Sequence, residues 1–137
     1  MAALELVVTF GLMILIWIIQ ILHYPSFHFV RPESFSEFAQ FHSSRITMIV
    51  LPLMLTEITL ASYRVLKSPD LEQVALFLLV IAIWLSTFFI QVPCHNKLAF
   101  GHDREVVQKL IDTNWIRTAL WSIKFFWLAW KFPWSNG

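Results

Sequence analysis

The sequence predicts an all-α fold in which four transmembrane helices form a bundle, with residues 1–137 as a single membrane domain. Hydrophobic residues make up 58% of the chain and charged residues only 14%, whereas roughly a quarter of the residues in a soluble domain are charged. Four stretches are also apolar over about the length that crosses the core of a bilayer. They are residues 6–22, 46–63, 73–94 and 113–130.

These four stretches carry few charges, and each is expected to be helical because lipid offers no partner for backbone N–H and C=O groups. The first and third have no charge, the second has Glu57, and the fourth has Arg117 and Lys124. The sequence "LKSPD" (66–70) predicts a tight turn between the second and third helices, because its proline stops a helix. A soluble four-helix bundle is the alternative, but its helices would show a polar face with a period of about 3.6 residues. The third stretch shows no such face.

One end of this bundle is predicted to carry the chemistry. Four alternating spans bring the connections after the first and third helices to the same end. All five histidines lie at or near this end, which we call the histidine end: His23, His28, His42, His95 and His102. The termini and the 66–70 turn lie at the opposite end. The net charge of +1 and the lack of a basic run give no reason to expect a nucleic-acid partner.

The chain divides into two halves of weakly similar order: residues 1–66 and residues 70–137. In each half an apolar helix ends in Gln, Pro and His, a polar connection follows, and an Arg then enters the next helix. Gln20 corresponds to Gln91 in this comparison, and Arg45 corresponds to Arg117. A duplication would relate two helical hairpins by a pseudo-twofold axis along the membrane normal. The alternative is a chance likeness, because few residues are identical.

The two connections at the histidine end contain amphipathic stretches, residues 32–42 and 103–112. Phe35 and Phe38 recur at helical spacing in the first stretch, and Val107 and Leu110 do so in the second. Both stretches suit a helix that lies in the membrane interface. The alternative is that they form the first turns of the second and fourth long helices, and the sequence leaves both readings open.

Polar side chains near the histidine end share helix faces. Gln91 and His95, for example, are four residues apart at the end of an apolar run. An arginine inside a span usually faces the bundle interior or a water-filled cavity, although its long stem also allows the guanidinium to reach the headgroups. Four side chains are therefore expected to point into the bundle: His23, His95, Arg45 and Arg117.

The candidate catalytic residues of the resulting pocket are His23, His42, His95, Arg45 and Arg117. The candidate ligand-binding residues are Gln20, Gln91, Asn114, Glu57, Tyr24 and Trp121. Histidine exchanges protons near neutral pH, and Arg, Asn and Gln hold a phenolate, an enolate, a carboxylate or a quinone head group. The predicted function is the binding of a small lipophilic molecule, or its redox or acid–base conversion. Whether the protein is an enzyme stays open.

Glu57 is the residue that most needs a partner. It lies about 18 Å beyond Arg45 along a helix that rises 1.5 Å per residue, deep in the span and away from the histidines. A carboxylate at that depth is protonated or paired, and Lys124 on the fourth helix is near enough in depth to meet it. Such a contact would be a structural clamp, and a neutral, hydrogen-bonded Glu57 is the alternative.

Aromatic residues collect at membrane interfaces, which accounts for tryptophans near the chain ends without a functional role: Trp127, Trp130 and Trp134. Three tryptophans lie nearer the polar residues and either share that role or line a flat apolar ligand: Trp17, Trp115 and Trp121.

Three other functions remain as alternatives. A metal ion is one, since His23, His42 and His95 come from three helices and are typical ligands, but no two histidines have the spacing of a metal motif. Haem with two axial histidines is another, but it needs room between helices, and Gly11 is the only glycine within a span. The third is a non-catalytic accessory subunit that docks in a larger membrane complex or on a second copy of the chain.

The stretches "QILHYPSF", "QVPCHNKLAFG" and "NWIRTALW" resemble a group of small four-span bacterial membrane proteins, over nearly the whole chain. The resemblance implies a multi-pass protein of the bacterial inner membrane and carries no activity. Basic residues are more frequent in cytoplasmic loops. Outside the deep spans, the histidine end has Arg31, Arg45, Lys97, Arg104 and Lys109, and the opposite end has Arg64, Lys67 and Lys131. The histidine end is therefore expected in the cytoplasm.

Overall fold

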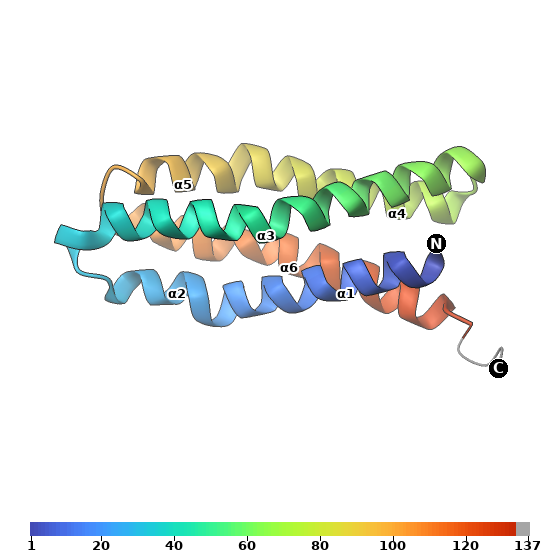
Figure 1. The fold of residues 1–137 in the computed structure, drawn as a ribbon, viewed down its shortest axis with the longest axis horizontal. Coiled ribbons are helices and arrows are strands. Elements are labelled where there is room, and N and C mark those ends of the chain that lie inside the picture. The colour runs from blue at the N-terminus through green and yellow to red at the C-terminus, as the bar shows by residue number, and fades with distance from the viewer. Residues whose placement is uncertain (134–137) are drawn as a thin grey trace.

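The computed structural model describes residues 1–133, and this part of the chain consists of helices and short connections, without a strand. The helices join into four long rods (Figure 1). Rod one runs through α1 (Ala2–Ile18), a π-helical segment (Ile19–His23), α2 (Tyr24–Ser26) and a 3-10 turn (Phe27–Phe29). Rod two is α3 (Pro32–Lys67). Rod three comprises α4 (Leu71–Ser86), a second π-helical segment (Thr87–Gln91) and α5 (Val92–Leu98). Rod four is α6 (Arg104–Lys131).

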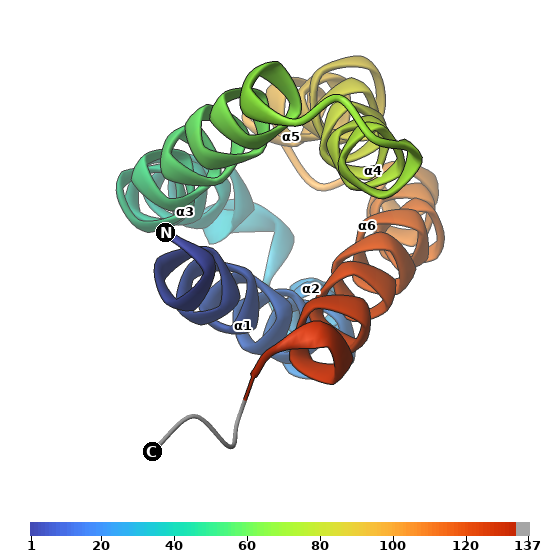
Figure 2. The same cartoon turned by 90° about the vertical axis from the view of Figure 1, so that its right-hand side faces the viewer.

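The four rods lie side by side and run antiparallel to their neighbours along the chain (Figure 1). Viewed along their length, they surround a common axis, with α1 packed against α3 and α6, and α4 packed against the same two helices (Figure 2). The connections after rods one and three lie at one end, and the N-terminus and the turn between α3 and α4 lie at the other. The all-α prediction and the placing of the histidine end are therefore confirmed.

Three of the rods have the length and composition needed to cross a membrane: Ala2–Phe29, Pro32–Lys67 and Leu71–Leu98. Each contains one of the first three predicted spans, and their apolar character makes the fold compatible with an integral membrane protein. The fourth rod, α6, is long enough but is not among these candidates, because charged and polar residues are spread along it.

The short connections follow the turn chemistry of the sequence. Asp70 caps α4 by accepting a hydrogen bond from the backbone N–H of Gln73 at 2.9 Å, as residues at helix N-termini commonly do. Asp103 caps α6 in the same way through the N–H groups of Glu105 and Val106. The predicted turn at 66–70 is present, since α3 ends at Lys67 and α4 begins after Asp70.

The two amphipathic stretches do not form separate interfacial helices. Residues 32–42 are the first turns of α3, which continues without a break from Pro32. Residues 103–112 likewise lead directly into α6. Phe35 and Leu110 are buried, so the apolar face of each stretch packs inside the protein, and the interface-helix interpretation is wrong.

Rods one and three share an irregularity at the histidine end. Each contains a π-helical segment, and each has a proline soon after it, Pro25 or Pro93. A proline inside a helix lacks an N–H donor and clashes with the carbonyl group four residues earlier, and a π-helical turn is one way to accommodate such a break. Gln20 and Gln91 lie within these segments and are almost fully buried, so the irregular turns direct amide side chains into the bundle.

The outer surface is strongly apolar. Large hydrophobic side chains on all four rods are exposed, among them Val7, Ile21, Met48, Leu78, Phe89 and Trp130. The interior holds a continuous cluster that includes Leu12, Phe27, Ile83, Leu98 and Leu110. A soluble monomer rarely exposes apolar patches of such extent, so this surface indicates a lipid or protein environment. Trp134 lies outside the described residues.

Candidate functional site

The polar groups of the histidine end meet around one side chain, Arg117 of α6. Only 6% of Arg117 is exposed. Its Nε donates to Asn114 Oδ1 at 3.0 Å, and its Nη2 donates to the hydroxyl of Tyr24 and to Gln91 Oε1, both at 3.3 Å. A longer contact of 3.5 Å joins Nη1 to the hydroxyl of Thr87. The guanidinium thus links α6 to rods one and three.

The amide of Gln20 completes the link between rod one and α6. Its oxygen accepts hydrogen bonds from Asn114 Nδ2 at 2.8 Å and from the Thr118 hydroxyl at 3.3 Å. Its nitrogen donates to the carbonyl oxygen of Ile111 at 3.1 Å. Both polar atoms of the Gln20 side chain therefore have partners within the protein, so this residue holds rod one against α6.

Two pairs of rings extend the network from Tyr24. The hydroxyl of Tyr24 lies 3.0 Å from His95 Nε2, and His23 Nε2 lies 2.6 Å from His42 Nδ1. A hydrogen bond between two imidazole nitrogens requires one donor and one acceptor, so one of the two facing nitrogens carries a proton and the other does not. The rings of His42 and His95 are 5.4 Å apart between centroids. The buried Nε2 of His42 has no partner among residues 1–133.

A cavity of about 260 Å³ lies beside this network. Most of its wall is apolar and comes from all four rods, with Leu12, Ile16, Val50, Met54, Trp84 and Trp121 among the lining residues. Its polar lining includes Tyr24, Gln91, His95 and Arg117. An apolar wall with a few convergent polar groups is typical of a small-molecule site.

The cavity opens to the side of the bundle. Its exposed lining residues are Thr47 and Leu51 on α3, Phe88 in the second π-helical segment and Val92 on α5. The opening therefore lies between rods two and three, on the apolar outer surface rather than at the end of the bundle.

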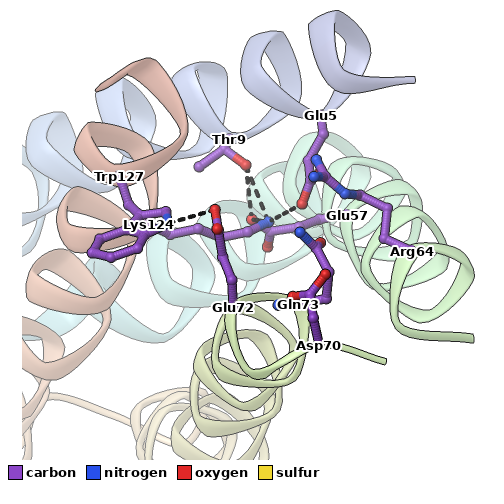
Figure 3. A network of polar contacts seen from close by, with 9 residues as sticks. All are labelled: Glu5, Thr9, Glu57, Arg64, Asp70, Glu72, Gln73, Lys124 and Trp127. Carbon is purple, nitrogen blue, oxygen red and sulfur yellow. Dashed lines mark hydrogen bonds and ion pairs between the residues drawn. The ribbon is translucent and has the colours of Figure 1, made fainter. Parts of the chain in front are cut away.

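A second polar cluster lies toward the opposite end, and we call it the carboxylate cluster: Glu5, Thr9, Glu57, Arg64 and Lys124 (Figure 3). Lys124 Nζ lies 3.0 Å from Glu57 Oε1, 3.3 Å from Glu5 Oε1 and 3.2 Å from the hydroxyl of Thr9. Arg64 Nη1 is 2.6 Å from Glu5 Oε2. Trp121 Nε1 donates to the other oxygen of Glu57 at 3.0 Å.

The carboxylate cluster is buried except at Arg64, whose side chain is 28% exposed, and it is balanced in charge. Lys124 and Glu57 are fully buried, Glu5 is nearly so, and two carboxylates face two cations. The contact between Glu57 and Lys124 that their depths suggested is present. Trp121 lines the cavity and also contacts this cluster, whereas Glu57 is not a lining residue of the cavity. A ligand-binding role for Glu57 stays a prediction.

Arg45 is the clearest difference between expectation and structure. Its side chain is exposed, and its guanidinium lies 5.4 Å from the centroid of the Phe41 ring. The prediction that Arg45 points into the bundle is therefore wrong, although the same prediction holds for Arg117 and His95. The two arginines occupy different environments, so the internal duplication stays a prediction with no support from this pair.

Several residues of the two clusters were not expected from the sequence. Thr87, Thr113 and Thr118 provide hydroxyl partners for Arg117, Gln91 and Gln20. A single threonine in an apolar stretch does not by itself indicate a polar site. Glu5 was not expected in a buried cluster, because this residue precedes the first apolar stretch. Its spacing of four residues from Thr9 was a usable signal, since both lie on one helix face.

The described residues contain no preformed metal site. No group of three His, Cys, Asp or Glu side chains within residues 1–133 is arranged to hold a metal ion, so His23, His42 and His95 meet without forming such a group. Comparisons with family models, curated proteins and solved structures return no match for this chain.

Proposed function

We propose that the protein is a multi-pass membrane protein that binds a small lipophilic molecule in the cavity beside Arg117. One observation carries the proposal: an apolar cavity of about 260 Å³, open toward the outer surface, has Tyr24, Gln91, His95 and Arg117 on its wall. A lipophilic molecule entering from the bilayer would keep its apolar body against the wall. Its polar head would meet the hydrogen-bonding groups.

The proposal includes α6 as a fourth transmembrane helix in a four-helix bundle. Within residues 113–130 of α6 both charged side chains face inward, since Arg117 is 6% exposed and Lys124 is fully buried. The outer face of this stretch carries exposed large apolar side chains: Trp115, Ile116, Ile123, Phe126, Trp127 and Trp130. A lipid-facing surface of this kind fits a span whose charges are satisfied inside the bundle. The basic residues of the histidine end favour a cytoplasmic location for that end.

The site also supports proton exchange with a bound molecule. Tyr24 and His95 are hydrogen-bonded at 3.0 Å, and both line the cavity. A tyrosine and a neutral histidine joined in this way act as an acid–base pair when a ligand oxygen lies within hydrogen-bond reach. This geometry supports acid–base or proton-coupled redox conversion as the chemical step, with Gln91 and Arg117 holding the ligand's head group.

Native mass spectrometry of the purified protein, together with its ultraviolet–visible spectrum, tests the binding proposal. Val50→Phe narrows the cavity from α3, and Leu55→Phe makes the same kind of change on an exposed position of that helix. We expect the wild type and Leu55→Phe to release a lipophilic molecule, and Val50→Phe to release none. Release of the same molecule from Val50→Phe would contradict the proposal. A stoichiometric partner chain without a small molecule would instead support an accessory subunit.

A further inference from the structure

Arg117 is a buried cation without a counter-ion. Its hydrogen-bond partners are Asn114, Gln91, Tyr24 and Thr87, and all four side chains are neutral in their usual state. The ion pairs within residues 1–133 all involve Glu5, Glu57 or Glu72, and none of them includes Arg117. The neutral partners accept hydrogen bonds from Nε, Nη1 and Nη2 but leave the positive charge uncompensated.

A charge in this position is costly. Moving an ionised group out of water into an apolar interior carries a large penalty unless an opposite charge is nearby. The carboxylate cluster shows the usual solution, because Lys124 has Glu57 and Glu5 within ion-pair distance. Arginine side chains stay protonated in proteins, so this penalty is not avoided by loss of a proton. An anion that reaches the guanidinium would therefore be stabilised strongly.

The cavity provides the place for such an anion, because Arg117 forms part of its wall. A donor on the same wall lacks a hydrogen-bond partner: the buried indole N–H of Trp84 makes no hydrogen bond within residues 1–133. An anionic oxygen supplies both what Arg117 lacks, a counter-charge, and what the Trp84 N–H lacks, a hydrogen-bond acceptor. Apart from its few polar groups, the wall is apolar, with Ile16 and Met54 among its residues, and in the described part of the chain it contains no lysine and no second arginine.

Resting on the proposed function, we propose that the cavity takes a molecule with one anionic oxygen head group on an apolar body, and that Arg117 is its counter-ion. A carboxylate or an ionised phenol fits this description, since a guanidinium binds such oxygens through charge-assisted hydrogen bonds. A doubly charged phosphate would leave one charge unmatched. The apolar body extends between α3 and α5, where exposed Leu51 and Val92 border the opening.

Binding of paired probes tests the head-group charge. Radiolabelled decanoate and decanol have the same chain and differ in charge at neutral pH, and scintillation proximity counting on detergent-purified protein measures both. We expect the wild type to bind decanoate at least about tenfold more tightly than decanol, because the anion gains a charge-assisted hydrogen bond. An ionised dinitrophenol and its methyl ether repeat the comparison for the phenolate class, through the shift in melting temperature that ligand binding produces.

Variants then assign the effect to Arg117. Arg117→Gln is expected to weaken decanoate binding about tenfold or more and to leave decanol binding within about twofold. Arg117→Lys keeps the charge and is expected to retain part of the preference, which also guards against a folding defect in the first variant. Arg104→Gln makes the same substitution at the exposed start of α6 and is expected to leave both affinities unchanged.

The outcomes separate this inference from the proposed function. Equal binding of the charged and neutral probes in the wild type, abolished by Val50→Phe, would keep the cavity as a ligand site and overturn the anionic head group. If the wild type binds every probe as weakly as Val50→Phe does, both the ligand site and the anionic head group are overturned. A preference for anions that survives in Arg117→Gln would overturn the role of Arg117. If the wild type prefers the ionised dinitrophenol over its methyl ether but does not prefer decanoate over decanol, the carboxylate class is excluded and the phenolate class remains.

Discussion

Two buried cations on the same face of α6 have opposite surroundings. Arg117 and Lys124 are seven residues apart, about 10 Å along the helix, and both are turned into the bundle. Lys124 meets two carboxylates, a hydroxyl group and no cavity, whereas Arg117 meets neutral side chains and borders a cavity. The first arrangement is complete within the protein and joins three rods. The second leaves the positive charge of Arg117 without a counter-ion among the described residues, which is the basis of the proposed anion site.

The largest expected effect comes from removing the cation of the complete cluster. Lys124→Met leaves Glu57 buried without an ion-pair partner and Glu5 with Arg64 alone. Breaking a buried pair by removing one partner costs about 3–5 kcal/mol, and thermal unfolding in detergent measures the loss. Lys131→Met, at the partly exposed pair with Glu72, is the matched control with an expected loss below about 1 kcal/mol. Similar losses in both variants would refute the contrast between buried and exposed pairs.

Restoring the charge balance sharpens this prediction. In the double variant Lys124→Met with Glu57→Gln, the remaining charges are Glu5 and Arg64, which lie 2.6 Å apart. We expect the double variant to recover more than half of the stability lost in Lys124→Met, because the stranded carboxylate is gone. The melting temperatures of the two single variants and the double variant provide the measurement. Strictly additive losses would mean that the charge balance of the cluster contributes little.

Replacement of Arg117 is expected to cost less stability than replacement of Lys124. Arg117→Gln leaves Asn114, Tyr24 and Thr87 with one partner fewer but strands no charge, and lost hydrogen bonds of this kind cost about 1–3 kcal/mol. Thermal unfolding in the absence of added ligand measures the difference. A loss as large as that of Lys124→Met would indicate that Arg117 already has an anionic partner in the purified protein.

The smallest expected effect concerns the other arginine of the histidine end. Arg45→Gln changes an exposed side chain whose guanidinium lies over the Phe41 ring, and such surface substitutions usually change stability by less than about 0.5 kcal/mol. Decanoate affinity is also expected to stay within about twofold of wild type. A large loss of affinity would show that the two arginines are equivalent after all, and would revive the duplication.

Much of the helical framework was predictable from the sequence, and the packing face of each helix was only partly so. Apolar run lengths located three rods, and the proline and aspartate of 66–70 located the turn between two of them. The helical spacing of Asn114 and Arg117 placed both on one face of α6, where they are hydrogen-bonded. Depth along the helices suggested the contact between Glu57 and Lys124.

The misses have a common physical reason. Periodicity shows which residues share a face, but packing against other rods decides which face turns inward. His42 and Arg45 are three residues apart, yet His42 is 5% exposed and Arg45 is exposed, because the boundary of the packed face passes between them. Glu5 was missed for a related reason, since hydropathy ends a span at the first charge, whereas the folded protein turns that charge inward and pairs it with Arg64.

The π-helical segment of rod one sets the angular phase of everything that follows it. An α-helix turns by about 100° per residue, and a π-helical turn accommodates one residue more than an α-helical turn. Glu5 and Thr9 before the segment and Tyr24 after it all point into the bundle. If the same residues formed a regular α-helix instead, Tyr24 would be rotated by about 100° relative to α1, away from Arg117. The extra residue of the π-helical turn thus sets the direction of the side chains that follow it. One continuous rod can therefore contribute residues to both polar clusters.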